Sequence, residues 1–204
     1  YSGNISGAGT VSKLGANVLT LTGTQTYTGA TATGDAGGGL VFTNNTLPVT
    51  PGAFTGNGTL TIQPVAAGSF GSTLSTNAYS FGSTLTGLTL GRDGNTASIT
   101  VNSPLSIAGP LSIYGGDITL NSAIGTSNTT NGDILLRGAD INSAFGINLA
   151  NGRTLTVDNA GSNSILSGII AGTSANLLKQ GAGDMYLRGV NTYSGLTTVT
   201  AGYL

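Results

Sequence analysis

Three aspartates occupy positions where paired carboxylates could act on a substrate. Asp117, Asp133 and Asp140 each follow a glycine or an alanine and precede a short segment that alternates apolar and polar residues. If the chain coils regularly, these carboxylates line up on one face, and a pair about 5 to 10 Å apart is how glycosidases cleave polysaccharides. Arg137 or Arg153 beside them would complete such a groove. The alternative, which we favour, is that each aspartate accepts hydrogen bonds from turn amides where a strand begins.

Other reactive groups are few. The chain has no His and no Cys, which excludes Ser-His-Asp triads, thiol chemistry and most transition-metal sites. A Ser–Lys pair would need Lys13 or Lys179, but both occupy one place in an internal repeat, which favours a structural role. Residues 91–96 resemble a calcium loop, yet a calcium-binding solenoid repeats its motif many times and this chain does not. We predict no catalytic, cofactor-binding or metal-binding residue and leave any binding residue unassigned.

Aromatic residues and glycine runs offer two further interpretations. Phe70, Tyr79, Phe81 and Tyr114 could stack on sugars, although we favour packing against the core or under loops. The glycines at 7 and 9 and at 37–39 lack the following helix that a phosphate-binding loop needs. Nucleotide binding is therefore not predicted.

The elements that would position these residues are strands. Charged residues make up 6% of the 204 residues, against about 25% in ordinary proteins. Leu, Ile and Val occur in short clusters separated by Gly, Ser, Thr and Asn, and no 3.6-residue periodicity is sustained, so the class is all-β. The net charge of −1 gives no basic patch for nucleic acid. No apolar run approaches the roughly 18 residues of a membrane span, so no membrane insertion is expected.

Short alternating segments predict a stacked coil. Each has three or four residues, too few for a stable meander, and turn residues separate one from the next. Stacked in parallel they form a continuous ladder around an apolar interior. We predict a right-handed parallel β-helix (β-solenoid) of about ten rungs with loop insertions; a β-sandwich would need longer strands in tight hairpins. The segments are residues 88–90, 98–101, 111–113, 117–120, 133–136, 147–149 and 154–157.

One region is less regular. Residues 34–82 hold Pro48, Pro51 and Pro64 and are interpreted as loop-rich rungs of a single solenoid segment spanning 1–204. A separate small domain there is the alternative. The chain starts within a repeat pattern, so we expect it to be part of a longer protein.

The chain also repeats itself, near residues 11–33 and 177–204. Shifting the second copy back by about 166 positions superimposes it on the first without a gap. Shared lysine and tyrosine, both rare here, make chance agreement a poor explanation. The coincident pairs are Lys13/Lys179, Gly15/Gly181, Ala16/Ala182, Leu21/Leu187, Gly23/Gly189, Thr26/Thr192, Tyr27/Tyr193, Gly29/Gly195 and Thr31/Thr197. Each tyrosine is expected to cover the end of a coil with its hydroxyl in water.

These motifs resemble a known family. The C-terminal copy, with Lys179, Gly181-x-Gly183, Asn191-Thr-Tyr-x-Gly195 and Gly202-x-Leu204, is similar to the autotransporter-associated β-strand repeat of type V secretion passengers. The N-terminal copy departs from it at Gln25 and at Ala32-Thr33. Residues 105–120 and 131–136 resemble filamentous haemagglutinin-type adhesins. The resemblance implies a parallel β-helix that is exported across the outer membrane as a stalk or adhesive filament, and it carries over no catalytic residue.

Together these observations predict a structural or adhesive segment of a secreted bacterial surface protein. We expect a β-solenoid stalk that serves adhesion, a biofilm matrix or assembly into extracellular filaments, located outside the cell. The partner classes are further copies of the chain, joined laterally or end to end, and host-cell or matrix glycans or proteins; no nucleic acid is expected. The alternative is a β-helix that binds or degrades polysaccharide with its aspartates.

Overall fold

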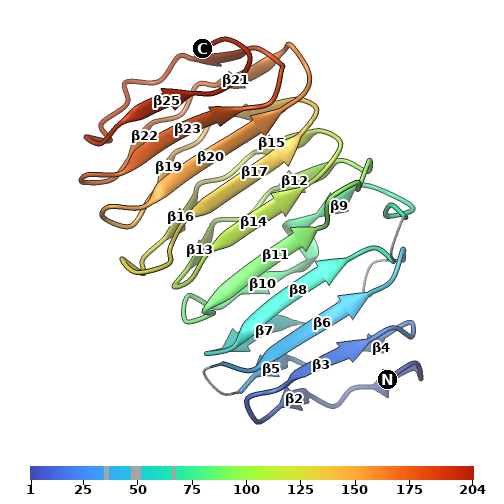
Figure 1. The fold of residues 1–204 in the computed structure, drawn as a ribbon. Coiled ribbons are helices and arrows are strands. Elements are labelled where there is room, and N and C mark those ends of the chain that lie inside the picture. Colours follow the sequence, from blue (N-terminus) through green and yellow to red (C-terminus); the bar gives the residue numbers. More distant parts are fainter. Residues whose placement is uncertain (35–36, 47–51, 66–67) are drawn as a thin grey trace.

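The computed structural model describes residues 1–34, 37–46, 52–65 and 68–204. These residues form a parallel β-solenoid whose successive turns stack into three long faces (Figure 1). Every strand pairing among them is parallel and in register. The predicted all-β solenoid is confirmed.

The first face is one continuous sheet. Among the described residues it contains nine strands, which correspond to eight complete turns from first to last. That number is close to the ten predicted. The strands are β3 (Val18–Leu21), β6 (Gly39–Thr43), β8 (Thr59–Gln63), β11 (Gly87–Gly91), β14 (Leu111–Tyr114), β17 (Ile134–Gly138), β20 (Thr154–Asn159), β23 (Asn176–Gln180) and β25 (Thr197–Val199).

The second and third faces are built from shorter strands. In chain order, second-face strands follow first-face strands and lead into third-face strands. The second face holds β1 (Ser6–Gly7), β4 (Thr26–Tyr27), β9 (Leu74–Ser75), β12 (Ile99–Val101), β15 (Ile118–Leu120), β18 (Ile141–Ser143), β21 (Ser164–Leu166) and β24 (Met185–Leu187). The third face holds β2 (Val11–Lys13), β5 (Thr31–Thr33), β7 (Ala53–Gly56), β10 (Ser80–Phe81), β13 (Leu105–Ile107), β16 (Ile124–Thr126), β19 (Ile147–Asn148) and β22 (Ile170–Ala171).

The seven segments predicted as strands each overlap a strand, with ends within about two residues of the expected ones. The prediction succeeds because an alternating three-residue segment buries its apolar side chains toward the solenoid axis and leaves its polar side chains outside. Ile118 and Leu120, for example, are buried on either side of the half-buried Thr119. A 3₁₀ turn, η1 (Thr76–Ala78), is the one helical element among the described residues.

Columns of aligned side chains make the core. Because the register is maintained, each inward residue packs on its counterpart one turn away. One column runs through all nine strands of the first face. Its members are apolar except for Lys179, in the eighth strand. Its members are Leu21, Phe42, Ile62, Leu90, Ile113, Leu136, Val157, Lys179 and Val199.

The region of residues 34–82 contains the longest turn. Register partners along the first face are 20 residues apart between Gly39 and Thr59, and 28 residues apart between Thr59 and Gly87. Pro48 and Pro51 lie outside the described residues. The described strands β6 to β10 pair with the rest of the solenoid.

Candidate functional site: a polar ladder and a groove at one corner

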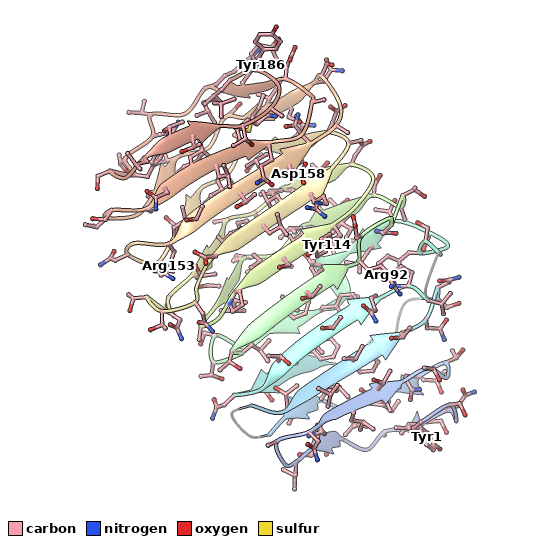
Figure 2. The ribbon with its side chains drawn as sticks, in the orientation of Figure 1. Tyr1, Arg92, Tyr114, Arg153, Asp158 and Tyr186 are labelled. Carbon is pink, nitrogen blue, oxygen red and sulfur yellow. The ribbon has the colours of Figure 1, made fainter. Side chains whose placement is uncertain are left out.

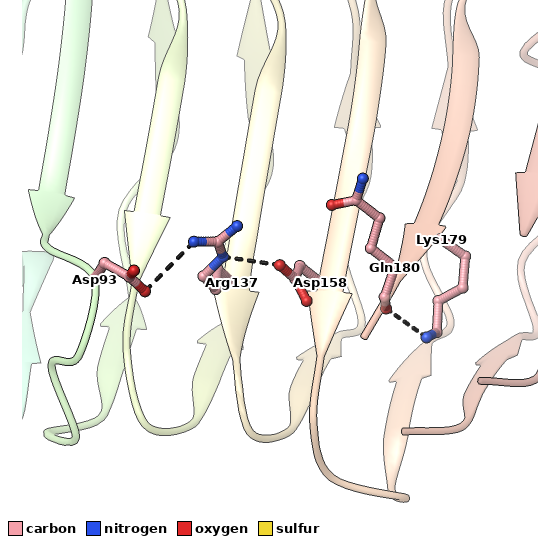
Figure 3. A network of polar contacts seen from close by, with 5 residues as sticks. All are labelled: Asp93, Arg137, Asp158, Lys179 and Gln180. Atoms are coloured by element: carbon pink, nitrogen blue, oxygen red, sulfur yellow. Dashed lines mark hydrogen bonds and ion pairs between the residues drawn. The ribbon is translucent and has the colours of Figure 1, made fainter. Parts of the chain in front are cut away.

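A ladder of polar side chains follows the outer surface where the first-face strands end. Tyr114, Arg137, Asp158 and Gln180 are register partners on four successive turns. Paired residues of neighbouring strands lie about 4.8 Å apart, so the four side chains stack along the solenoid axis. Figure 2 labels Tyr114 and Asp158 of this row, and Figure 3 shows Arg137, Asp158 and Gln180.

Arg137 is the centre of this ladder. Its Nε donates to Asp158 Oδ2 at 2.8 Å, and its Nη1 lies 3.4 Å from Asp93 Oδ1 (Figure 3). Its guanidinium carbon lies 5.8 Å from the centre of the Tyr114 ring, a cation–π distance. Because the arginine side chain is 40% exposed, these ion pairs orient the guanidinium more than they stabilise the fold.

A groove of about 490 Å³ lies beside the ladder, at the corner between the first and second faces. Arg137 stands on the first-face side. Ser98 and Asp117, which precede second-face strands, stand on the other side. The complete lining is Gly94, Asn95, Thr96, Ser98, Gly115, Gly116, Asp117, Arg137, Gly138, Ala139 and Ala160.

The three aspartates predicted to line up do so only in part. Asp117 and Asp140 precede the neighbouring strands β15 and β18, and the backbone N–H of Asp140 donates to Asp117 Oδ1 at 3.3 Å. Asp133 precedes β17 at a different corner, where it accepts the N–H of Thr154 at 2.8 Å. One carboxylate, that of Asp117, lines the groove among the described residues.

The hydrogen bonds of these aspartates differ from the prediction in one respect. Asp140 accepts the N–H of Asn163, 23 positions later, and Asp117 and Asp133 likewise bond to the following turn. The carboxylates accept hydrogen bonds from backbone amides, as expected, but these amides belong to the next turn and not to the aspartate's own loop. Each carboxylate therefore ties two turns together.

Arg153 and the loop of residues 91–96 lie in different surroundings. Arg153 donates from Nη1 to the carbonyl of Thr130 at 2.5 Å, at the corner of Asp133 and away from the groove. In the 91–96 loop, Asp93 pairs with Arg137, and the buried side chain of Asn95 bonds to the carbonyls of Ala97 and Tyr114. Among the described residues no three His, Cys, Asp or Glu side chains are grouped as a metal site.

Lys13 and Lys179 cap backbone carbonyls. Lys13 Nζ donates to the carbonyls of Leu14 and Gly15. Lys179 Nζ repeats this geometry with Gln180 at 2.6 Å (Figure 3) and Gly181 at 2.9 Å, and it adds Ala201 of the next turn at 3.2 Å. Burial lowers the pKa of Lys179, an effect that Asp158 and Asp184 partly offset. The structural role that the repeat predicted for both lysines is confirmed.

The aromatic residues considered as sugar platforms lie mostly in the core. Phe70 and Tyr79 are buried, and burial raises the pKa of Tyr79 to about 12. Phe81 is half-buried and stacks on Phe54 at 5.7 Å. Tyr114 lies beneath Arg137. The packing interpretation therefore describes Phe70, Tyr79 and Phe81.

The repeated tyrosines make the same bond in different surroundings. Tyr27 and Tyr193 each share a hydrogen bond of 2.6 Å with the threonine four residues later, Thr31 and Thr197. The expectation of a wet hydroxyl is wrong for Tyr27, which is 2% exposed. Its hydroxyl bonds to the buried Thr31, and burial raises the pKa of Tyr27 against the opposing effect of the Thr31 bond.

Both copies thus share a lysine that caps two carbonyls and a tyrosine bonded to a threonine. The segments 11–32 and 177–204 match the sequence model of the passenger-associated-transport-repeat. These two segments, 50 of the 204 residues, are similar to this repeat. No curated protein and no solved structure matches the chain.

The passenger-associated-transport-repeat and the solenoid fit a secreted autotransporter passenger. The family implies a secreted or cell-surface protein and suggests a structural role. No helix in the described part of the chain is long and apolar enough to cross a membrane. The prediction that no residue is catalytic stays a prediction.

Sequence reasoning missed Asp93 and Asp158 as the partners of Arg137. A usable signal existed, because Arg137 and Asp158 are 21 residues apart, close to the length of one turn. Asn95 and Asn159 were also missed. Both are buried and donate to carbonyls at the same corner, yet nothing in a chain rich in Asn distinguishes them beforehand.

Proposed function

We propose that this segment is a stalk of a secreted bacterial surface protein, and that it holds an adhesive part of the parent protein away from the cell. The name of the repeat links it to passenger transport, which agrees with a segment that folds outside the cell. The observation that carries the proposal is the continuous first-face sheet. Eight turns at about 4.8 Å each give a length of about 40 Å.

Neutral side-chain ladders support a role outside the cell. On the second face, Asn121 Nδ2 donates to Asn102 Oδ1, and Asn102 Nδ2 donates to Ser75 Oγ, both at 2.8 Å. These bonds connect three successive turns without charge. Because salt screens ion pairs far more than neutral hydrogen bonds, such a stalk keeps its stiffness when the ionic strength outside the cell changes.

The stalk proposal is tested by adding one turn to the parent protein on the cell surface. A duplicate of residues 155–176 inserted after Asn176 keeps the register, because Leu155 pairs with Leu177. We expect normal display, attachment within about twofold of the parent, and a stalk about 5 Å longer in solution scattering. A duplicate of residues 155–165 is the control, since half a turn breaks the register and lowers display. Normal display with lost attachment after the full-turn insertion would contradict the proposal.

Lateral self-association belongs to the same proposal. The outward column at the middle of the first face is uncharged and includes Val41, Thr89, Leu135 and Leu178. A surface with few charges repels its copies weakly. Sedimentation velocity over a range of concentrations should show association that Leu135→Lys with Leu178→Lys removes. A chain that remains monomeric throughout would refute lateral association and leave the stalk proposal standing.

A further inference from the structure

The corner groove has the shape of a site for a linear chain. Its lining comes from the ends of four successive turns, at Asn95, Gly116, Gly138 and Ala160. Equivalent positions on four turns span about 14 Å along the axis. The groove therefore runs parallel to the axis and is straight because the turns stack in register.

Close backbone packing keeps the floor of the groove bare. A Cβ at Gly116 would lie 2.2 Å from the carbonyl oxygen of Thr96, and one at Gly138 would lie 2.8 Å from that of Gly116. No side chain larger than hydrogen fits either position without moving the neighbouring turn. The floor is thus a row of stacked peptide groups, with Ala139 and Ala160 alongside.

The walls carry oriented polar groups. Arg137 is held by Asp93 and Asp158 through Nη1 and Nε, and no acceptor among the described residues bonds to its Nη2. Opposite, Asp117 Oδ1 accepts the N–H of Asp140, while its Oδ2 has no bonding partner in the described part of the chain. Ser98 adds a hydroxyl. A donor and an acceptor on facing walls suit a ligand whose hydroxyl groups both donate and accept.

The local charge distinguishes between classes of ligand. At this corner four acidic residues, Asp93, Asp117, Asp140 and Asp158, outnumber two basic ones, Arg92 and Arg137, so the net charge is −2. Arg137 is already paired with two carboxylates. An anionic polymer, whether a uronic-acid polysaccharide or a nucleic acid, would meet repulsion.

From these observations we infer that the corner groove binds a neutral, extended polysaccharide, with one sugar residue per turn of the solenoid. The turn spacing is about the length of one pyranose residue in an extended β-linked chain, so successive sugar residues lie over successive turns of the solenoid. Arg137 donates to sugar hydroxyls and Asp117 accepts from them. The inference concerns binding only and does not depend on the stalk proposal.

The test measures binding of defined tetrasaccharides to the purified chain by isothermal titration calorimetry. Cellotetraose is the extended neutral probe, maltotetraose is the neutral probe that curves, and tetragalacturonate is the anionic one. We expect cellotetraose to bind at least about tenfold more tightly than either of the others. Equal or tighter binding of tetragalacturonate, or no binding of cellotetraose at millimolar concentration, would overturn the inference.

Two matched variants locate the site. Ala139→Trp places a large ring in the groove, whereas Ala182→Trp places the same ring at the same corner two turns further on, outside the lining residues. Ala139→Trp should weaken cellotetraose binding at least about tenfold, and Ala182→Trp should leave it within about twofold. Asp117→Asn should also weaken binding, while Asp133→Asn, at the other corner, should not. If both tryptophan variants bind cellotetraose as the parent does, the groove is not the site.

Discussion

The two segments similar to the passenger-associated-transport-repeat place the same motif in different surroundings. In the N-terminal copy Lys13 ends β2 on the third face, while in the C-terminal copy Lys179 lies in β23 on the first face. The local contacts are nevertheless the same, from lysine to the next two carbonyls and from tyrosine to the threonine four residues on. One repeat therefore makes one turn, and it makes that turn from whichever face it starts on.

Burial separates the two copies. Leu21 and Tyr27 are almost completely buried, whereas their counterparts Leu187 and Tyr193 are half-buried. The difference arises because the backbone of residues 1–7 lies against the first copy, with Thr22 bonded to the carbonyl of Tyr1. The motif determines the contacts, and burial by the neighbouring turn determines how much these contacts stabilise the fold.

The leucine pair should show the largest effect of this difference. Leu21→Ala removes a fully buried side chain and should lower the free energy of unfolding by about 3 kcal/mol. Leu187→Ala should cost about 1 kcal/mol, since less apolar surface leaves water there on folding. Urea titration of both variants measures the two costs. Equal costs would show that burial by the neighbouring turn does not matter.

For the lysine pair, the larger loss of unfolding free energy is expected in the C-terminal copy. Lys179→Met removes a donor from three part-buried carbonyls and should cost about 2 to 3 kcal/mol, whereas Lys13→Met removes a donor from two and should cost about 1 to 2 kcal/mol. The same urea titrations apply, with hydrogen exchange at Ala201 as a local measure. A larger loss at Lys13 would contradict the role of the third carbonyl.

Alkaline pH should destabilise the chain through its buried tyrosines. An unfolded tyrosine ionises near pH 10, but Tyr79 in the folded chain keeps its proton up to a pKa of about 12. The stability contributed by Tyr79 is thus complete below pH 10 and is lost as the pH rises through 12, a fall of about 2 kcal/mol.

Tyr79→Phe should flatten this part of the profile of unfolding free energy against pH. Tyr27→Phe should flatten a smaller part of the profile, because the Thr31 hydrogen bond opposes the rise that burial causes in the pKa of Tyr27. Parallel profiles for the parent and Tyr79→Phe would refute the assignment of this alkaline loss of stability to Tyr79.

The smallest effect is expected at the charged ladder. Arg137→Gln should cost less than about 1 kcal/mol at low salt and almost nothing in molar salt, since its ion pairs are exposed and screened. Asn102→Ala, in the neutral ladder of the second face, should cost about 1 kcal/mol at either salt concentration. A cost at Arg137 that persists in molar salt would show that its packing on Tyr114 outweighs its ion pairs.

Much of the fold could be predicted because it is encoded locally. Alternating triplets such as Leu105–Ile107 specify a strand with one apolar side, and Lys, Gly and Tyr at a shared spacing specify the repeat. The candidate site was harder to predict. Arg137 and Asp117 were named in advance, but their grouping depends on where the loop residues fall in each turn, which the sequence pattern does not show.

The sequence by itself determined the class, the parallel stacking and the structural role of the two lysines, because each follows from residue types within a few positions of one another. The tertiary structure alone decided the registers between turns. It therefore decided that Asp133 lies away from Asp117 and Asp140, that Tyr27 is enclosed, and that the corner groove exists. Turns of 20 to 28 residues differ by loop residues whose conformation depends on the turn beneath them, and no pattern within a single turn records that contact.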